Sequence, residues 1–413
     1  MCYALVRPAA TLLRLRPKQL HRRRLPVSAF SLTSFSSFCG SPMDDRSPAT
    51  ILVLSGKSPR EDAVALSLKS RSDTVKLIDE EGAETRVLLG SEADDATFDP
   101  RSYMDALSAS RFGRFLIWSP KIPSTHDVVS KWEQPKPISF FFSFQFSIRL
   151  LDFESRRWVF VSWIGTSLSF LWAQSALRIC STKEETPIFF GFEGRVKNVW
   201  ESPIGCLLFS FTLQMEDGRK LPLLQYVVSL AVTEAIKTLC QKKGLPNLDV
   251  RIKWPNDLYL NGLKLGGILC TSTYRSKNFN VCAGIGLNLD NEKPTTCLNA
   301  ALREINPSSV RLSREEVLAS FFNKFETFLE IFLTEGFQPL EELYYKTWLH
   351  SGQEVVIEEK QEGQPDEKII VTVQGLTSDG YLLAIDEDDK SYALHPDGNS
   401  FDFFKGLVRR KLG

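Results

Sequence analysis

Two side chains of opposite charge, Asp257 and Lys264, flank a short apolar hairpin and are the residues of this chain best suited to chemistry. Asn261-Gly262 stands between two apolar runs, which is a strong signal for a tight β-hairpin. The turn should therefore return Lys264 toward the corner that carries Asn256 and Asp257. A carboxylate and an ammonium in one cleft suit phosphate-transfer chemistry, because the cation neutralises phosphoryl oxygens and the acid orients a metal or a polar group.

Glycines accompany these charged residues on neighbouring strands. Gly266 and Gly267 follow Lys264 and remove side chains where a backbone or a ligand must approach closely. By alternation we expect Leu263 and Leu265 to face the core and Lys264 to point to the other side. Downstream, Ala283-Gly-Ile-Gly-Leu-Asn288 predicts a strand with Gly284 and Gly286 on one face, although it lacks the third glycine of a dinucleotide fingerprint.

The elements that must position these residues follow from hydrophobic periodicity and from cap signals. The pattern predicts strands over 205–214, 249–254 and 281–289, and an amphipathic helix over 222–243 that ends at Gly244. A capping box, Ser313 with Glu316, opens a second helix. Its buried side should consist of apolar residues at helical spacing: Val317, Phe321, Phe325, Phe328 and Phe332.

The C-terminal part changes to short β segments. These are expected over 354–357, 369–373, 381–384, 392–394 and 404–409, with Asp379-Gly380 as one of the turns. About sixty residues of short strands between 352 and 411 fit a small SH3-like β-barrel. The predicted fold class is therefore α+β, with a catalytic domain of one mixed sheet and packing helices over 119–340, followed by this barrel. Residues 50–118 are expected to form an extra N-terminal α/β region.

Charge is unevenly spread along the 413 residues. Lys plus Arg and Asp plus Glu number 50 each, but residues 1–43 hold six arginines, one lysine and no acid, which leaves 43 basic against 50 acidic residues elsewhere. The acidic body argues against a nucleic-acid-binding protein. The basic, serine-containing 1–43 segment is typical of a transit peptide to plastid or mitochondrion, and translation from Met43 would give a cytosolic form. Eight scattered cysteines without a CxxC pair, and only four histidines, predict no metal site of Cys and His.

Residues 131–190 do not match their surroundings and are interpreted as an atypical insertion. Eleven aromatic residues fall between Ile138 and Trp172 without a clean period. Residues 158–177 carry no charge and are long enough to span a membrane. The serines, glycine and glutamine within this run, and the arginines beside it, disfavour that reading. Nearer the N-terminus, Gly56-Lys57-Ser58 lacks the glycine that a phosphate loop needs five residues before its lysine.

Taken together, the motifs resemble those of biotin–protein ligase, also called holocarboxylase synthetase, of the plant type. The resemblance is carried by Lys253-Trp-Pro-Asn-Asp257, the hairpin lysine Lys264, Gly284-x-Gly286-x-Asn288, Lys197-Asn-Val-Trp-Glu-Ser-Pro203 and Pro123-Ser-Thr-His-Asp127. It covers roughly 105–130 and 194–411. Any one of these motifs could arise by chance, but their order is specific.

The resemblance implies a two-step reaction. Biotin and ATP, with Mg²⁺, form biotinyl-5′-AMP, and a lysine of an acceptor then takes the biotinyl group. The implied partners are biotin-dependent carboxylases and their biotin carboxyl-carrier domains, and the implied assembly is a monomer or a weak dimer.

The resemblance also implies a role for individual residues. Lys264, Arg195 and Asp257 would be the catalytic residues, with Lys264 on the biotin carboxylate and the adenylate phosphate. Ser124 and Thr125 would bind the biotin ring, and Trp200 would lie beside adenine. The remaining binding residues would be Gly194, Asn256, Gly266, Gly267, Gly284, Gly286 and Asn288. From the residues alone, tryptophans such as Trp200 and Trp254 are more often core residues than ligand contacts, Ser124-Thr125 could be a helix cap, and His126 would be incidental.

The chain departs from the family at one loop. The family reads Gly-Arg-Gly-Arg where this chain reads Phe192-Glu193-Gly194-Arg195, and 68 residues separate Thr125 from Gly194. A glycine that permits close approach is lost, and an anion replaces a cation beside carboxylate and phosphate. The sequence therefore predicts a biotin ligase of weak or impaired activity, or alternatively a non-catalytic relative that binds biotin, ATP or the acceptor.

Overall fold

The computed structural model describes twelve stretches of the chain. They are 50–70, 85–93, 98–119, 125–126, 159–162, 187–189, 204–275, 277–291, 295–359, 367–395, 399–402 and 407–410. All belong to one compact unit, Ser47–Gly413. The predicted transit peptide over 1–43 and most of the predicted insertion over 131–190 lie outside the described residues.

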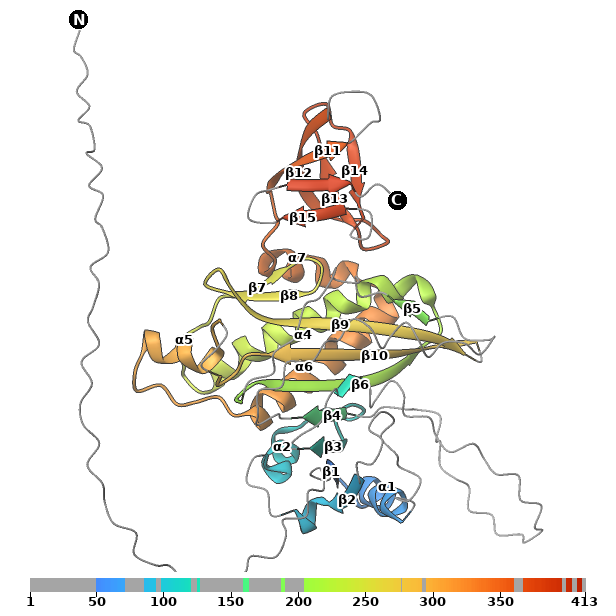
Figure 1. The fold of residues 1–413 in the computed structure, drawn as a ribbon, viewed down its shortest axis with the longest axis vertical. Coiled ribbons are helices and arrows are strands. Elements are labelled where there is room, and N and C mark those ends of the chain that lie inside the picture. The colour runs from blue at the N-terminus through green and yellow to red at the C-terminus, as the bar shows by residue number, and fades with distance from the viewer. Residues whose placement is uncertain are drawn as a thin grey trace, which may run out of the picture. The chain divides into compact units, whose positions relative to one another are not determined.

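The described strands of the larger sheet number ten, in the order β2-β1-β3-β4-β6-β10-β9-β8-β7, with β5 paired to β9 (Figure 1). Their bounds are β1 (Thr50–Gly56), β2 (Thr85–Leu89), β3 (Phe115–Ser119), β4 (Val159–Ser162), β5 (Pro187–Phe189), β6 (Leu207–Met215), β7 (Val250–Lys253), β8 (Asp257–Leu260), β9 (Leu263–Arg275) and β10 (Asn278–Leu287). The pairs β1–β2 and β3–β4 are parallel and the other pairs are antiparallel. The predicted mixed sheet is therefore confirmed.

Strands from the N-terminal region continue this sheet. β1 and β3 pair with each other, and β3 pairs in turn with β4. The four residues of β4 come from the stretch that was weighed as a membrane span, and they lie between β3 and β6. These four residues are thus part of a sheet.

Helices lie on both faces of the sheet. Their bounds are α1 (Pro59–Lys69), α2 (Pro100–Ala106), α4 (Leu221–Lys242), α5 (Leu298–Ile305), α6 (Arg314–Glu335) and α7 (Gln338–Thr347), with 3₁₀ turns η2 (Gly90–Glu92) and η3 (Gly218–Lys220). Helices α2, α4 and α6 cover one face of the sheet, whereas Ala65 of α1 packs with Leu52 and Leu54 on the other face. Figure 1 shows α4 and α6 packed behind the central strands. The rings of Phe209 and Phe211 on β6 pack against those of Phe321 and Phe325 on α6, with ring centroids 4.8–5.8 Å apart.

The predicted start and buried side of α6 are confirmed. The Ser313 hydroxyl accepts a hydrogen bond from the Glu316 amide, and the Glu316 carboxylate accepts one from the Ser313 amide, which is the capping box. All five residues expected on the buried side are less than 10% exposed. Among the described residues, α4 with the preceding 3₁₀ turn is apolar and long enough to cross a membrane, but it is mostly buried in this core.

The small C-terminal β domain is confirmed as a six-stranded sheet in the described residues, in the order β14-β13-β12-β11-β16-β15. Its strands are β11 (Glu354–Glu359), β12 (Glu367–Leu376), β13 (Leu382–Ile385), β14 (Ser391–Leu394), β15 (Asn399–Asp402) and β16 (Leu407–Arg410). β15 was not predicted, because Asn399-Ser-Phe-Asp402 has no alternation of apolar residues. Gly380 takes a positive φ of 83° in the turn before β13, as the Asp-Gly signal indicates.

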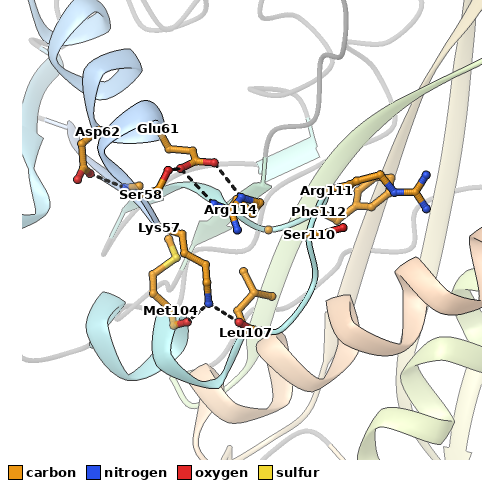
Figure 2. A network of polar contacts seen from close by, with 12 residues as sticks. Lys57, Ser58, Glu61, Asp62, Met104, Leu107, Ser110, Arg111, Phe112 and Arg114 are labelled. Carbon is orange, nitrogen blue, oxygen red and sulfur yellow. Dashed lines mark hydrogen bonds and ion pairs between the residues drawn. The ribbon is translucent and has the colours of Figure 1, made fainter.

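Lys57 of the Gly-Lys-Ser sequence has a structural role. Its ammonium donates hydrogen bonds to the carbonyl oxygens of Met104, at 2.5 Å, and of Leu107, at the end of α2 (Figure 2). Carbonyls at a helix C-terminus lack intrahelical partners and favour a cation. Beside it, Arg114 pairs with Glu61 at 2.8 Å. The lysine therefore joins β1 to α2, which agrees with the absence of a phosphate-loop pattern.

The segment after α2 is fixed to α6 by one carboxylate. Glu326 accepts hydrogen bonds from the backbone amides of Ser110, Arg111 and Phe112 at 2.7–3.1 Å, and from the Ser110 hydroxyl at 2.8 Å. Partial burial raises the pKa of Glu326, but these donors outweigh burial and the pKa lies below its ordinary value of 4.5. The charged form of Glu326 is therefore the one that holds the N-terminal region on α6.

Replacing Glu326 with glutamine should lower the free energy of unfolding by about 2 kcal/mol at pH 7, because charge-assisted hydrogen bonds are weakened. The contribution of Glu326 is complete above the unfolded pKa and is lost as pH falls through the lower folded pKa, so the two proteins should converge in acid. Urea unfolding at pH 7 and near pH 3.5 measures this difference. Glu330→Gln is the control, since Glu330 is 68% exposed and pairs with Arg111 at 3.4 Å, and its effect should stay under about 0.5 kcal/mol.

Candidate active site

The central strands have two unlike faces. On β6, the residues Phe209 and Phe211 point to the helices, so the alternate residues Leu208, Ser210 and Thr212 point away. The same face continues on the neighbouring strand β10, where Gly284 lies opposite Ser210 and Gly286 lies opposite Leu208. Apart from Leu208, the residues named on the face away from the helices are small or polar, and they include the predicted glycines.

Glycines occupy the middle of one row on this face. Gly286 pairs with Gly267 on β9, and Gly267 pairs with Asp257 at the start of β8. The row runs Leu208, Gly286, Gly267, Asp257 across four strands. Two adjacent positions without side chains allow a flat ligand to approach the backbone closely beside a carboxylate.

Gly266 has a packing reason of its own. A Cβ on this residue would lie 2.4 Å from the carbonyl oxygen of Gly286, which is closer than carbon and oxygen can approach. Gly266 lies opposite Leu287, on the other side of the backbone from the glycine row. Its predicted role at the ligand therefore stays a prediction, while its role in strand packing follows from the structure.

Asp257 and Lys264 come together as the hairpin predicts. The Lys264 ammonium lies 2.6 Å from one carboxylate oxygen of Asp257, and the Lys253 ammonium lies 3.9 Å from the other. Asp257 is thus flanked by two cations, and the group carries one net positive charge. All three side chains are partly exposed, at 19–43%. Lys253 was not predicted as a site residue, although it lies opposite Asp257 in the β7–β8 pair.

A β-bulge lets Lys264 and Gly267 share this face. Leu258 pairs with Gly266, but Tyr259 pairs with Lys264, so Leu265 is an extra residue without a partner on β8. Without the bulge, Lys264 and Gly267 would point to opposite faces, because they are three residues apart. Leu265 is fully buried, as predicted, but Leu263 is 50% exposed, so the prediction that it faces the core was wrong. It adjoins the Asn261-Gly262 turn, which is exposed as well.

Asn256 is held by the neighbouring strand. Its side-chain amide donates to the carbonyl oxygen of Ile268 at 2.8 Å, and its own carbonyl accepts from the Ile268 amide at 2.9 Å. The corner before Asp257 contains a cis peptide between Trp254 and Pro255. Trp254 is 3% exposed, so the reading of this tryptophan as a core residue is confirmed. Asn256 fixes the corner that presents Asp257.

Asn288 ties the end of β10 to the lysine segment. Its side chain accepts from the Cys206 thiol at 3.3 Å and donates to the Thr295 hydroxyl at 3.2 Å, and that hydroxyl donates to the Lys264 carbonyl at 2.6 Å. Burial raises the pKa of Cys206 to about 12, so the thiol keeps its proton as a donor. Thr295 was missed, since nothing in the sequence relates it to Lys264.

Thr125 and His126 lie over the other end of the polar face. The hydroxyls of Thr125 and Ser210 are 2.8 Å apart, and His126 Nε2 lies 3.0 Å from the Thr271 hydroxyl. A Cβ on Gly284 would lie 3.2 Å from Ser210 Oγ and 3.4 Å from His126. The structure thus brings Thr125 to Gly284, and it gives His126, which the sequence left without a role, a place on the same face. Alternation along the predicted strand over 205–214 was the signal for the face on which Ser210 lies.

Four predicted site residues, Ser124, Gly194, Arg195 and Trp200, lie outside the described residues. Within the described residues, no group of three or more His, Cys, Asp or Glu gathers as a metal site would require. The site that can be built contains Thr125, Asn256, Asp257, Lys264, Gly267, Gly284, Gly286 and Asn288. It offers a net positive end near Lys264 and a neutral, hydroxyl-lined end near Thr125, which suits an elongated ligand with one anionic part.

The chain is similar to known proteins of one kind. The model of the "Biotin/lipoate A/B protein ligase family" matches residues 190–288, and that of the "Biotin protein ligase C terminal domain" matches residues 350–406. "Biotin--protein ligase 1, chloroplastic" of Arabidopsis thaliana is 52% identical over 401 residues, 96% of this chain and 94% of that protein. "Biotin--protein ligase 2" of the same plant is 53% identical over 87% of this chain and 98% of that protein. A structure of a biotin protein ligase from Aquifex aeolicus with biotin and ATP covers 72% of this chain and 99% of its own, at 22% identity and a TM-score of 0.43.

The chain therefore belongs to the biotin protein ligase family. Its relatives of highest identity named here are plant proteins, so the plant type inferred from the motifs is confirmed. The small β domain corresponds to the family's C-terminal domain.

Gly266→Ala should lower the free energy of unfolding by about 2 kcal/mol, because the new methyl must displace the β10 backbone at Gly286. Gly284→Ala is the matched control: its nearest neighbours are side chains at 3.2–3.4 Å, and its cost should be under about 1 kcal/mol. Denaturant unfolding of both variants beside the natural protein makes the measurement. Equal stability of the two variants would contradict the close approach of β9 to β10.

Proposed function

We propose that this chain ligates biotin to a lysine of a biotin carboxyl-carrier domain through biotinyl-5′-AMP. In the first step an oxygen of the biotin carboxylate attacks the α-phosphorus of ATP, supplied as its magnesium complex, and the bond to the β-phosphate oxygen breaks to release pyrophosphate. In the second step the neutral amine of the acceptor lysine attacks the acyl carbon. AMP leaves with the anhydride oxygen, and the amine loses a proton.

The observation that carries this proposal is the Lys264–Asp257 pair at the edge of the glycine row. Carboxylate and α-phosphate are both anionic and must meet, so the reaction needs a cation between them. Lys264 is 43% exposed at its side chain and has a second lysine, Lys253, on the far side of Asp257. Asp257 orients the two ammonium groups, and an arriving anion takes over part of the contact with Lys264.

The neutral end of the face suits the other part of biotin. The hydroxyls of Thr125 and Ser210 are donors and acceptors 2.8 Å apart, which fits a ureido group with both N–H and C=O. Gly284 pairs with Ser210 on this face, and a Cβ there would contact Ser210 and His126. The assignments of Ser124, Gly194, Arg195 and Trp200 rest on the sequence resemblance and stay part of this proposal.

We further propose that the natural chain is a slow ligase, because Phe192 and Glu193 stand where the family has Gly and Arg. A carboxylate beside the reacting anions opposes their approach, and a lost cation costs several kcal/mol at such sites. The same observation favours the second candidate, a non-catalytic binder of biotin, ATP or acceptor. Import into plastids is proposed from the basic, acid-free residues 1–43 and from the chloroplastic relative; the mitochondrion, or the cytosol for a product from Met43, are the alternatives.

Lys264→Gln should reduce biotin-dependent exchange of pyrophosphate into ATP by about 100-fold, since a cation at the developing anhydride is lost. Lys237→Gln serves as control, because Lys237 pairs with Glu234 on α4 and its side chain is 45% exposed. Exchange is measured with ATP, Mg²⁺ and biotin, followed by transfer to an acceptor domain. If Lys264→Gln exchanges pyrophosphate at the natural rate, Lys264 is not a catalytic residue. If the natural protein binds biotin in calorimetry but shows no exchange, the result favours the non-catalytic binding protein.

Restoring the family loop tests whether the residues at 192 and 193 slow the reaction. The double change Phe192→Gly with Glu193→Arg recreates Gly-Arg-Gly-Arg with Gly194 and Arg195, and it should raise the exchange rate about 100-fold. Glu193→Gln removes the anion without adding a cation and should give a smaller gain. If the double variant is no faster than the natural chain, impairment by this loop is contradicted.

A further inference from the structure

Trp254, which precedes the corner that presents Asp257, is tied to the small β domain by two hydrogen-bond chains. Its backbone amide donates to His350 Nε2 at 2.8 Å. Its indole N–H donates to the Tyr226 hydroxyl at 2.8 Å, and that hydroxyl donates to the carbonyl oxygen of Gly380 at 2.5 Å. His350 stands just before β11, and Gly380 lies in the turn before β13. Both chains are buried and both end in the small β domain.

The backbone around His350 is also joined to β7 and to the small β domain. The Leu349 amide donates to the Ile252 carbonyl at 2.9 Å, which pairs this segment with the edge of the main sheet. On the other side, the Val373 amide donates to the Gln353 carbonyl at 2.9 Å, and the Gln353 amide donates to the His350 carbonyl at 3.1 Å. His350 therefore lies where the two sheets are connected.

The hydrogen-bond partners of His350 fix its protonation. The Trp254 amide can only donate, so Nε2 must present its lone pair. Nδ1 then carries the proton and donates to Gln353 Oε1 at 3.0 Å. His350 is fully buried, and the Trp348 ring packs edge-on against it at 5.3 Å.

Burial keeps this imidazole neutral. Desolvation lowers the pKa of His350 to about 4, and the Lys253 ammonium lowers it further, while the bond to Gln353 opposes both. The side chain that accepts from Trp254 is therefore uncharged throughout the neutral pH range.

We propose that His350 is a positioning residue of the ligase site, which holds the Trp254 amide and so sets the place of Asn256 and Asp257. This role rests on the proposed function for its effect on rate. His350 acts through the corner: Trp254 is followed by Pro255 and Asn256, and Asn256 is fixed to Ile268. A displaced corner would move the Asp257 carboxylate away from Lys264 and Lys253, and rates of positioned reactions fall steeply with small displacements.

Three variants of the full chain test the role. His350→Leu removes the acceptor at similar volume, and His350→Gln offers an amide oxygen near the position of Nε2. Val371→Ala is the matched control, since Val371 is buried in β12 of the same domain, opposite Val355, and lies outside both hydrogen-bond chains. If the leucine variant does not fold, His350→Asn takes its place, because the shorter amide cannot reach the Trp254 amide.

Two readouts are independent of turnover. Hydrogen exchange over 253–258 should rise at least about fivefold in His350→Leu and stay near the natural value in His350→Gln and Val371→Ala. The second readout is the NMR spectrum of ¹⁵N-histidine-labelled protein, which has four histidines. The signals that disappear in His350→Gln belong to His350. They should show a protonated Nδ1 and an unprotonated Nε2. A protonated Nε2 at this residue overturns the proposal.

The kinetic readout completes the test. In His350→Leu, kcat for adenylate formation should fall about tenfold while KM for biotin changes less than about twofold, and His350→Gln should recover most of the rate. Val371→Ala should melt earlier with kcat unchanged. Unchanged exchange over 253–258 in His350→Leu overturns the positioning role, whether or not the protein turns over. If exchange rises as expected but the natural chain forms no adenylate, the positioning role stands and the proposed function fails.

Discussion

One bulge in the hairpin brings the row of glycines to the face that carries the charged residues of this site. The extra residue, Leu265, lets Lys264 and Gly267 share a face although they are three positions apart. On that face Lys264 pairs with Asp257 at 2.6 Å beside the row of glycines. A regular hairpin would have kept Lys264 opposite Tyr259 but would have placed Gly266, not Gly267, opposite Asp257. The open row beside the charged pair therefore depends on a local irregularity in a regular sheet.

The two faces of the sheet have different roles: one packs in the core and the other carries the candidate site. Toward α4 and α6 it presents aromatic and aliphatic residues, and Phe209 and Phe211 interlock with the phenylalanines of α6. Away from the helices it presents Ser210, Thr271, Gly284 and Asp257, which do not contribute to that core. Because β-strands alternate, both properties are encoded in the same few residues. The site can thus be open without weakening the core.

Segments far from the central strands support the same sheet. Glu326 of α6 fixes the segment after α2 through three backbone amides. At the other end, the small β domain is tied to Trp254 by the two hydrogen-bond chains through His350 and Tyr226. These supports use buried or partly buried polar groups whose protonation is set by their surroundings. The corner before Asp257 is consequently held from the main sheet and from the small domain together.

The sequence by itself determined the elements whose signals are local. These were the Asn261-Gly262 hairpin, the capping box at Ser313, the apolar stripe of α6 and the ordered motifs that indicate the family. Tertiary structure alone decided that β4 enters the sheet, that Leu263 is exposed, and that Thr295, Ser210 and His350 support the site. The physical reason is sequence separation. A cap or a turn depends on neighbours in the chain, whereas a register or a buried hydrogen bond depends on segments that can be as far apart in the sequence as the 154 residues between Tyr226 and Gly380.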